Sequence, residues 1–279
     1  MSEQLVQISK SSAARTSFVH EAVDVGGGRV LHVDGNSKIT AGNGSYEDPR
    51  PNALSLVQVE DCPESTPTCR ASCYVHGIEE HARDLHDLYR ANSRTIREIL
   101  PHMNAYARAA ARFARWIRQN AAGGFRWHVS GDVFGFQYAC WIVDVCKMSH
   151  DVQHWIYTRR TDGVLLGVLQ GARNLTINLS ADRDNYVRMR SLAHTMGNLR
   201  ITYMSTEGEV PDDLLLGSVI FPDYKLRGRD LQDPRDHAWW QGLTQEQRRM
   251  VCPVDFFGKS ETLRCGPCRK CIAPVGGDA

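Results

Sequence analysis

From residue 53 onward, short apolar runs alternate with longer amphipathic stretches. Six runs have the length and the β-branched or aromatic content of buried strands, and each of them ends in polar residues. They cover residues 53–60, 125–132, 154–160, 175–182, 199–206 and 218–223. The stretches between them, 78–100, 104–120, 136–148, 163–172 and 183–196, repeat apolar residues at three- and four-residue spacing. The pattern predicts a series of βα units.

Repeated βα units form a parallel sheet that is covered by its crossover helices. About six units favour an α/β fold with a TIM-like parallel barrel, complete or partial, and an open doubly wound sheet is the alternative. The 279 residues, 42% of them hydrophobic, are expected to form one compact domain. Its parts are an irregular lead-in over 1–52, rich in Gly, Ser and Asn, the βα barrel over 53–250, and a cysteine-rich metal-binding segment over 251–279.

Charge and hydropathy limit the expected compartment and partners of the protein. The formal net charge is +1, from 33 basic and 32 acidic residues, so no global field attracts nucleic acid or an anionic membrane. No apolar run reaches the roughly 18 residues that span a bilayer, and residues 1–17 lack the apolar centre of a signal peptide. We therefore expect a cytoplasmic protein without a membrane partner. In a reducing compartment, clustered cysteines are more often metal ligands or catalysts than disulfides.

Four of the nine cysteines lie near the end of the sequence, at Cys252, Cys265, Cys268 and Cys271. Two successive Cys-x-x-Cys steps allow three thiolates of one loop to converge, and the remote Cys252, which precedes a proline, supplies a fourth. Ferredoxin-type 4Fe-4S clusters use this arrangement. A structural zinc site with four thiolates is the alternative.

Three more cysteines, Cys62, Cys69 and Cys73, follow the first predicted strand with spacings of six and three residues. A 4Fe-4S cluster with three cysteine ligands keeps one iron free for a substrate or another ligand. His76 could instead complete a Cys3His zinc site. In a third alternative, a cysteine of the C-terminal group closes this site, so that both groups hold a single cluster.

Polar residues at the ends of the other strands are candidates for ligand binding. His128, Ser130 and Asp132 occupy alternate positions, and Arg159 offers a charged fork for an anion. We expect His128, Asp132 and Arg159 to act in catalysis, and Ser130, Ser180 and Asp182 to bind a cofactor. Strand-exit turns and helix caps are the structural alternative for these residues.

Taken in order, six blocks resemble a family of uncharacterised, cysteine-rich proteins of actinobacteriophages. The blocks are Gly35–Ile39, Cys62–Tyr74, Trp127–Asp132, Tyr157–Arg159, Leu179–Asp182 and the closing cysteine motif. More distantly, three cysteines after the first strand of a βα barrel look like the radical S-adenosylmethionine enzymes, which space their cysteines by three and two residues. That likeness implies a three-cysteine cluster that binds S-adenosylmethionine.

The leading hypothesis is thus a phage-encoded iron-sulfur protein with one or two 4Fe-4S clusters, one of them at the barrel mouth. It would carry out redox or radical chemistry on a small polar substrate, with an electron donor as partner. The alternative is a zinc-stabilised, non-catalytic binding module for nucleic acid, in which the basic residues Arg264, Arg269 and Lys270 contact phosphates.

Overall fold

The structure is a computed structural model that describes residues 18–36, 38–39, 50–81, 83–223, 226, 231–258, 260 and 262–273. Parts of the predicted lead-in (1–17, 37 and 40–49) and the end of the cysteine-rich segment (274–279) lie outside the described residues. This includes Ser37 of the block Gly35–Ile39.

One eight-stranded sheet organises the described chain, and its strands lie in sequence order from β1 to β8. The strands are β1 (Phe18–Gly26), β2 (Arg29–Asn36), β3 (Ala53–Leu54), β4 (Phe125–Trp127), β5 (His154–Thr158), β6 (Leu175–Ala181), β7 (Leu199–Ser205) and β8 (Val219–Pro222). β1, β2 and β3 pair antiparallel, whereas β3 to β8 are all parallel. The parallel order has no reversal of the kind that defines the doubly wound alternative. The sheet is open, since among the described residues β1 does not pair with β8.

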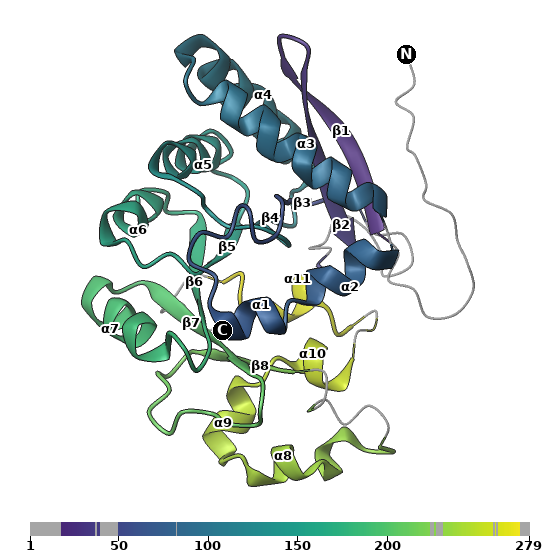
Figure 1. Cartoon of the computed structure of the whole chain (residues 1–279), viewed down its shortest axis with the longest axis vertical. Coiled ribbons are helices and arrows are strands. Elements are labelled where there is room, and N and C mark those ends of the chain that lie inside the picture. The colour runs from purple at the N-terminus through teal and green to yellow at the C-terminus, as the bar shows by residue number, and fades with distance from the viewer. Residues whose placement is uncertain are drawn as a thin grey trace.

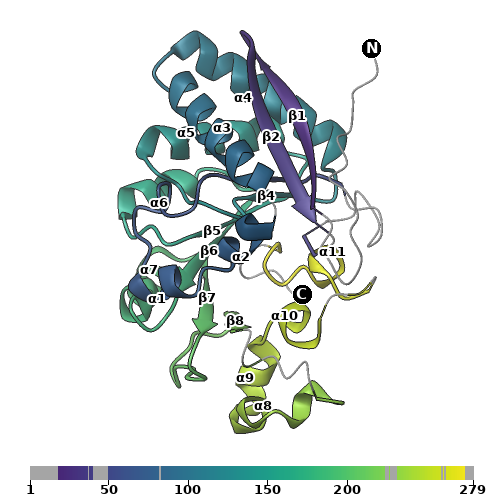
Figure 2. The same cartoon turned by 45° about the vertical axis from the view of Figure 1, so that its right-hand side comes forward.

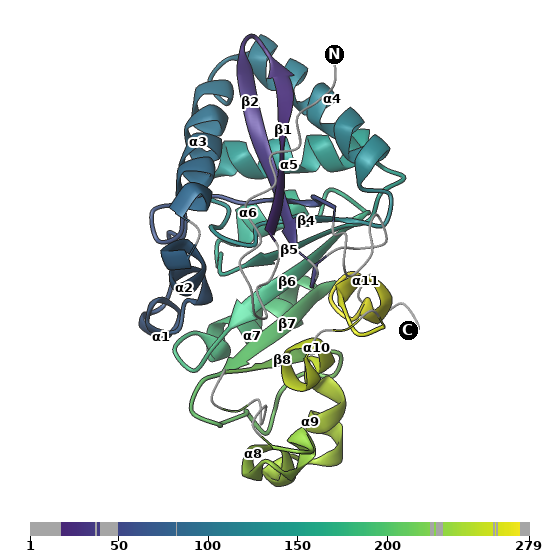
Figure 3. The same ribbon diagram turned by 90° about the vertical axis from the view of Figure 1, so that its right-hand side faces the viewer.

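The helices confirm the predicted βα rhythm. They are α1 (Pro67–Ala71), α2 (Tyr74–His81), α3 (Arg83–Ile99), α4 (Met103–Asn120), α5 (Phe136–Met148), α6 (Gly163–Leu169), α7 (Tyr186–Met196), the 3-10 turn η2 (Pro234–Asp236), α8 (Ala238–Gly242), α9 (Gln245–Met250), α10 (Pro253–Phe257) and α11 (Cys265–Cys268). Figures 1 and 3 show α5, α6 and α7 in a row on one side of the parallel strands, with α10 and α11 on the other side.

The two faces of the sheet differ in chemistry because successive strand residues point to opposite sides. On the helix-covered face, Trp127, Ile156, Ile177 and Ile201 are buried in the main hydrophobic core. The opposite face carries polar and aromatic side chains at the intervening positions. They line a cavity and include Arg126, Tyr157, Ser180, Thr202 and Phe221.

The predicted irregular lead-in is wrong for residues 18–36, which form a regular hairpin (Figure 2). Val23, Val25, Leu31 and Val33 are buried at alternate positions; β1 packs on α4 and β2 packs on α3. The turn is Gly26–Gly28, where all three residues have positive φ, a conformation that glycine adopts without steric cost. The alternation of period two is the sequence signal for this hairpin.

The segment after β8 returns across the cavity face of the sheet. The Thr176 hydroxyl donates to the Ile272 carbonyl at 2.8 Å, and the Asn178 amide donates to the Cys271 carbonyl at 3.0 Å. Arg200 binds the Ala273 carbonyl at 3.0 Å, while Ile272 packs on Trp155. Polar side chains of β6 and β7 thus bind the main chain of the cysteine-rich segment.

Candidate functional site

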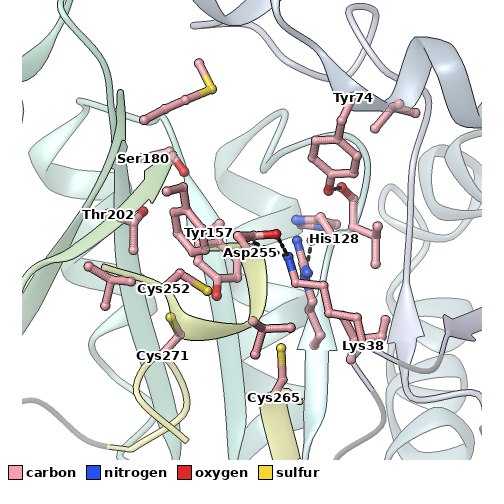
Figure 4. Close-up of a pocket in the computed structure, with 18 of the residues that line it drawn as sticks. Lys38, Tyr74, His128, Tyr157, Ser180, Thr202, Cys252, Asp255, Cys265 and Cys271 are labelled. Carbon is pink, nitrogen blue, oxygen red and sulfur yellow. Dashed lines mark hydrogen bonds and ion pairs between the residues drawn. The ribbon is translucent and has the colours of Figure 1, made fainter. Parts of the chain in front are cut away.

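Seven of the nine cysteines line one cavity of about 910 Å³. Its walls are the face of the sheet opposite α5, α6 and α7, the loop and helices that follow β3, and the region of α10 and α11. Figure 4 shows Cys252, Cys265 and Cys271 gathered on one side of the cavity, with Tyr74 on the far side.

The N-terminal cysteines are placed by the loop after β3 and by the short helix α1. Thr66 caps α1 by accepting from the Cys69 amide at 3.0 Å, and Pro67 occupies the first helical turn. Cys62 precedes this helix and Cys73 follows it. The three thiols lie close enough to interact electrostatically, and the Cys73 thiol also donates to the Gln58 side chain at 3.3 Å.

The C-terminal cysteines also converge. Cys252, Cys268 and Cys271 pack in one cluster with Val219 and Val254, and Cys265 interacts electrostatically with Cys252 and Cys271. The Cys265 amide donates to the Lys38 carbonyl at 2.9 Å, which ties α11 to the segment after β2.

Burial raises the pKa of the thiols of Cys62, Cys69, Cys252, Cys265 and Cys271. It raises the pKa of Cys62 to about 12, with Asp132 as the next cause, and the pKa of Cys265 to about 11. The thiols of Cys62 and Cys265 are therefore protonated at neutral pH in the absence of a metal. Metal binding would release those protons.

Neither group is arranged around a single ion. Among the residues that the structure describes, no three His, Cys, Asp or Glu side chains form a set that could hold a metal ion. His76, the candidate fourth zinc ligand, is exposed, and its Nδ1 lies 3.1 Å from the Gln58 side-chain nitrogen. A zinc ion needs sulfur ligands at about 2.3 Å.

A cationic and aromatic zone lies between the two cysteine groups. Lys38 Nζ pairs with both carboxylate oxygens of Asp255, at 2.8 and 2.9 Å (Figure 4). Arg126 projects from β4 and lies over the Tyr157 ring, 4.7 Å from its centroid. Arg126 interacts with the thiol of Cys265 and with the hydroxyl of Tyr74, the residue that follows Cys73. The zone therefore connects both cysteine groups.

His128 and Ser130 line the cavity as predicted, and both are almost fully buried. His128 has a positive φ of 65°, and its Nε2 lies 2.8 Å from the Tyr138 hydroxyl. Burial and then Arg126 lower the pKa of His128 to about 3, so the ring is neutral at physiological pH.

Asp132 also lines the cavity, but its carboxylate binds main-chain groups. It accepts from the amides of Val133 at 2.6 Å and Arg159 at 2.7 Å, which joins the end of β4 to the end of β5. Burial raises the pKa of Asp132.

Arg159 and Asp182 form a buried ion pair of 2.6 Å at the ends of β5 and β6. Asp182 also accepts from the Thr66 hydroxyl at 2.5 Å and therefore anchors the start of α1. Asp182 is 0% exposed and does not line the cavity, whereas Arg159 and the half-buried Ser180 do. The pair holds the cysteine-bearing helix in place.

The sequence prediction missed Arg126, Lys38, Asp255, Tyr74 and Tyr157. Arg126 had a detectable signal, because it is a lone charge at an alternating position of the apolar strand FRW. The Lys38–Asp255 pair joins residues 217 positions apart and has no local signal.

The basic residues of the nucleic-acid alternative do not form one open patch. Arg264 is buried, Arg269 lines the cavity, and Lys270 also lines it while its Nζ donates to the Arg249 carbonyl at 2.7 Å. Within the described ranges, no helix combines the length and apolar character needed to cross a bilayer.

Comparison with known proteins places this site in a phage family. A 148-residue region, 52% of the chain, is 27% identical to the "Gene 88 protein" of Mycobacterium phage D29 and covers 61% of that protein. No solved structure matches the chain. The model of the family "Gene product 88" matches residues 30–274, a range that contains both cysteine groups. The chain therefore belongs to the Gene product 88 family of phage proteins.

Proposed function

We propose that this protein is an iron-sulfur protein whose two cysteine groups hold clusters that face one cavity, where a small polar molecule undergoes redox chemistry. The observation that carries the proposal is the position of all seven clustered cysteines on the walls of a single cavity. Structural zinc sites have no need of a shared cavity, whereas redox centres must lie close to the substrate that they serve.

The spacing of the cysteines supports clusters over single zinc ions. Two successive Cys-x-x-Cys steps and a remote cysteine followed by proline are the arrangement that ferredoxin-type 4Fe-4S clusters use. In such a cluster each cysteine binds a different iron, and the thiols of each group interact electrostatically.

The numbers of cysteines suggest a division of labour. Cys62, Cys69 and Cys73 leave one coordination position of a 4Fe-4S cluster open, and they follow the first parallel strand, at the end of the sheet where βα barrels bind ligands. The sequential order of β3 to β8 agrees with the proposed partial TIM-like barrel, in an open sheet. We assign ligand chemistry to this group. The four C-terminal cysteines fill every position and would store or relay electrons from an external donor.

The likeness to radical S-adenosylmethionine enzymes remains a proposal about the cofactor of the three-cysteine group. His128, Ser130 and Asp132 follow β4 and face the same cavity as Cys62. The chemistry supplied by S-adenosylmethionine, when bound, would be reductive cleavage to a radical. This chain's own residues would orient it and exclude water.

Metal analysis of the anaerobically purified protein tests the proposal. We expect about seven to eight irons and as many sulfides per chain, because each of two cubane clusters holds four. Cys69→Ala and Cys268→Ala should each lose about half of the iron, whereas Cys140→Ala, on α5 and away from the cavity, should lose none. Stoichiometric zinc without iron would refute the proposal and favour the zinc module.

A further inference from the structure

Arg126 lines the cavity and forms no ion pair with a carboxylate of the described residues, although it interacts electrostatically with the buried Asp34. Two other cations that line this cavity are paired with carboxylates, the partly exposed Lys38 with Asp255 and the buried Arg159 with Asp182. Among the described residues, Arg126 instead donates its Nε to the His128 carbonyl at 2.9 Å and stacks over the Tyr157 ring. The Tyr74 hydroxyl takes one further N–H, so two of the five N–H groups of the guanidinium have partners in the described part of the chain and the others can bind a ligand.

Two neighbouring polar atoms also lack partners within the described structure. His128 Nδ1 and Ser130 Oγ are buried atoms without a hydrogen bond, and their residues are 2% and 3% exposed. Both residues line the cavity, two and four positions after Arg126. A buried polar atom without a hydrogen bond costs about 1–3 kcal/mol, so both side chains would gain from turning toward a polar ligand in the cavity that their residues line.

The backbone after β4 has an unusual conformation at two positions. His128 holds a left-handed conformation that non-glycine residues adopt at a cost, and Gly131 has a φ of 82°. These two residues with positive φ lie in the segment that follows β4, in which His128 and Ser130 line the same cavity as Arg126.

We propose that the cavity binds a small organic anion, with its oxyanion group on the Arg126 fork and its other polar groups on His128 and Ser130. Guanidinium binds carboxylate and phosphate in the same bidentate manner. The adjoining wall is apolar, with Tyr157 packed edge-on against Phe221 at 6.0 Å and Met204 beside them in the lining, which suits a planar or aliphatic body. This inference names the substrate class of the proposed redox site. Binding of the anion does not depend on the proposed function; only the fate of the bound molecule does.

Equilibrium dialysis of the anaerobically purified full chain tests this inference with three matched probes: benzoate, phenyl phosphate and benzyl alcohol. We expect one of the two anions to bind at one site per chain, at least tenfold more tightly than the uncharged alcohol. Equal binding of the anions and the alcohol, or no binding by either anion, would overturn the inference without the need for any variant.

Variants then locate the site. Arg126→Gln should weaken binding of the preferred anion at least tenfold and leave the alcohol unaffected. Arg70→Gln is the matched control, because Arg70 also lines the cavity but is exposed and donates to the Ser65 carbonyl at 2.7 Å; its effect should stay within twofold. Undiminished binding by a folded Arg126→Gln protein would contradict the assignment. Iron analysis of the same samples distinguishes the anion site from the iron-sulfur function. If iron-free protein binds the anion and the binding depends on Arg126, the anion site is supported and only the iron-sulfur function is refuted.

Discussion

Replacing Gly131 by alanine should destabilise the protein, because the added methyl group would clash with Leu56 in the loop that follows β3. A Cβ at this position would lie 2.6 Å from Leu56 Cβ and 3.1 Å from the Leu56 carbonyl carbon. Because Leu56 is fully buried and its amide donates to the Ser130 carbonyl at 2.9 Å, the loop cannot move aside freely.

Two costs combine at Gly131. A residue with a Cβ pays about 1–2 kcal/mol for a left-handed conformation, which Gly131 adopts at a φ of 82°. Overpacking a buried site costs about 1–3 kcal/mol more. We therefore expect Gly131→Ala to lower the free energy of unfolding by about 2–5 kcal/mol.

Gly217 offers a control that isolates the backbone cost. Its φ is 79°, nearly the same, but an added Cβ would meet no atom within 4 Å. Gly217→Ala should thus cost about 1–2 kcal/mol. Urea denaturation followed by circular dichroism measures both variants. If Gly131→Ala costs no more than Gly217→Ala, the close approach of Leu56 is not a constraint and the reasoning fails.

Three further outcomes are expected. Burial raises the pKa of Asp34 to about 6 from 3.8, so the folded state prefers the neutral acid. The free energy of unfolding should therefore fall by about 2 kcal/mol as the pH rises from about 4.5 to about 7. Asp34→Asn should remove that loss when urea unfolding is measured across this pH range, and an unaltered pH dependence would contradict the prediction. Arg159→Gln leaves the carboxylate of Asp182 buried without its cation, so unfolding free energy should drop by about 3–5 kcal/mol, whereas a fully stable variant would argue for a purely catalytic arginine. Cys268→Ala should lower both the melting temperature and the bound metal, because ligation orders the segment after Met250; full metal content with an unchanged melting temperature would exclude Cys268 as a ligand.

Local periodicity predicted α3 to α7 and the positions of the parallel strands, but it extended two strands too far: the run 53–60 became β3 (Ala53–Leu54) and the run 125–132 became β4 (Phe125–Trp127). The apolar run at 175–182 became β6 (Leu175–Ala181), and the amphipathic stretch at 104–120 became α4 (Met103–Asn120). These elements are specified by short-range spacing of apolar residues, which a single sequence displays directly.

The candidate site was predictable in its cysteines and less so in its other residues. Spacing grouped Cys62 with Cys69 and Cys73, but Arg159 and Asp182 were expected to serve a ligand and instead pair with each other. That pairing exists because β5 and β6 are neighbours in the sheet, a fact of topology that the sequence of either strand does not contain. The same holds for Arg126, whose importance depends on which face of β4 looks into the cavity.

The return of the cysteine-rich segment across the sheet has a consequence for how the protein matures. Thr176 and Ile272, which it joins, are 96 residues apart, so a growing chain makes the floor of the cavity well before the cover. During that interval Cys62, Cys69 and Cys73 are already synthesised while the face they border is uncovered. If the proposed iron-sulfur function holds, a cluster would be inserted into this group before the C-terminal segment covers the cavity, and the order of synthesis would set the order of assembly.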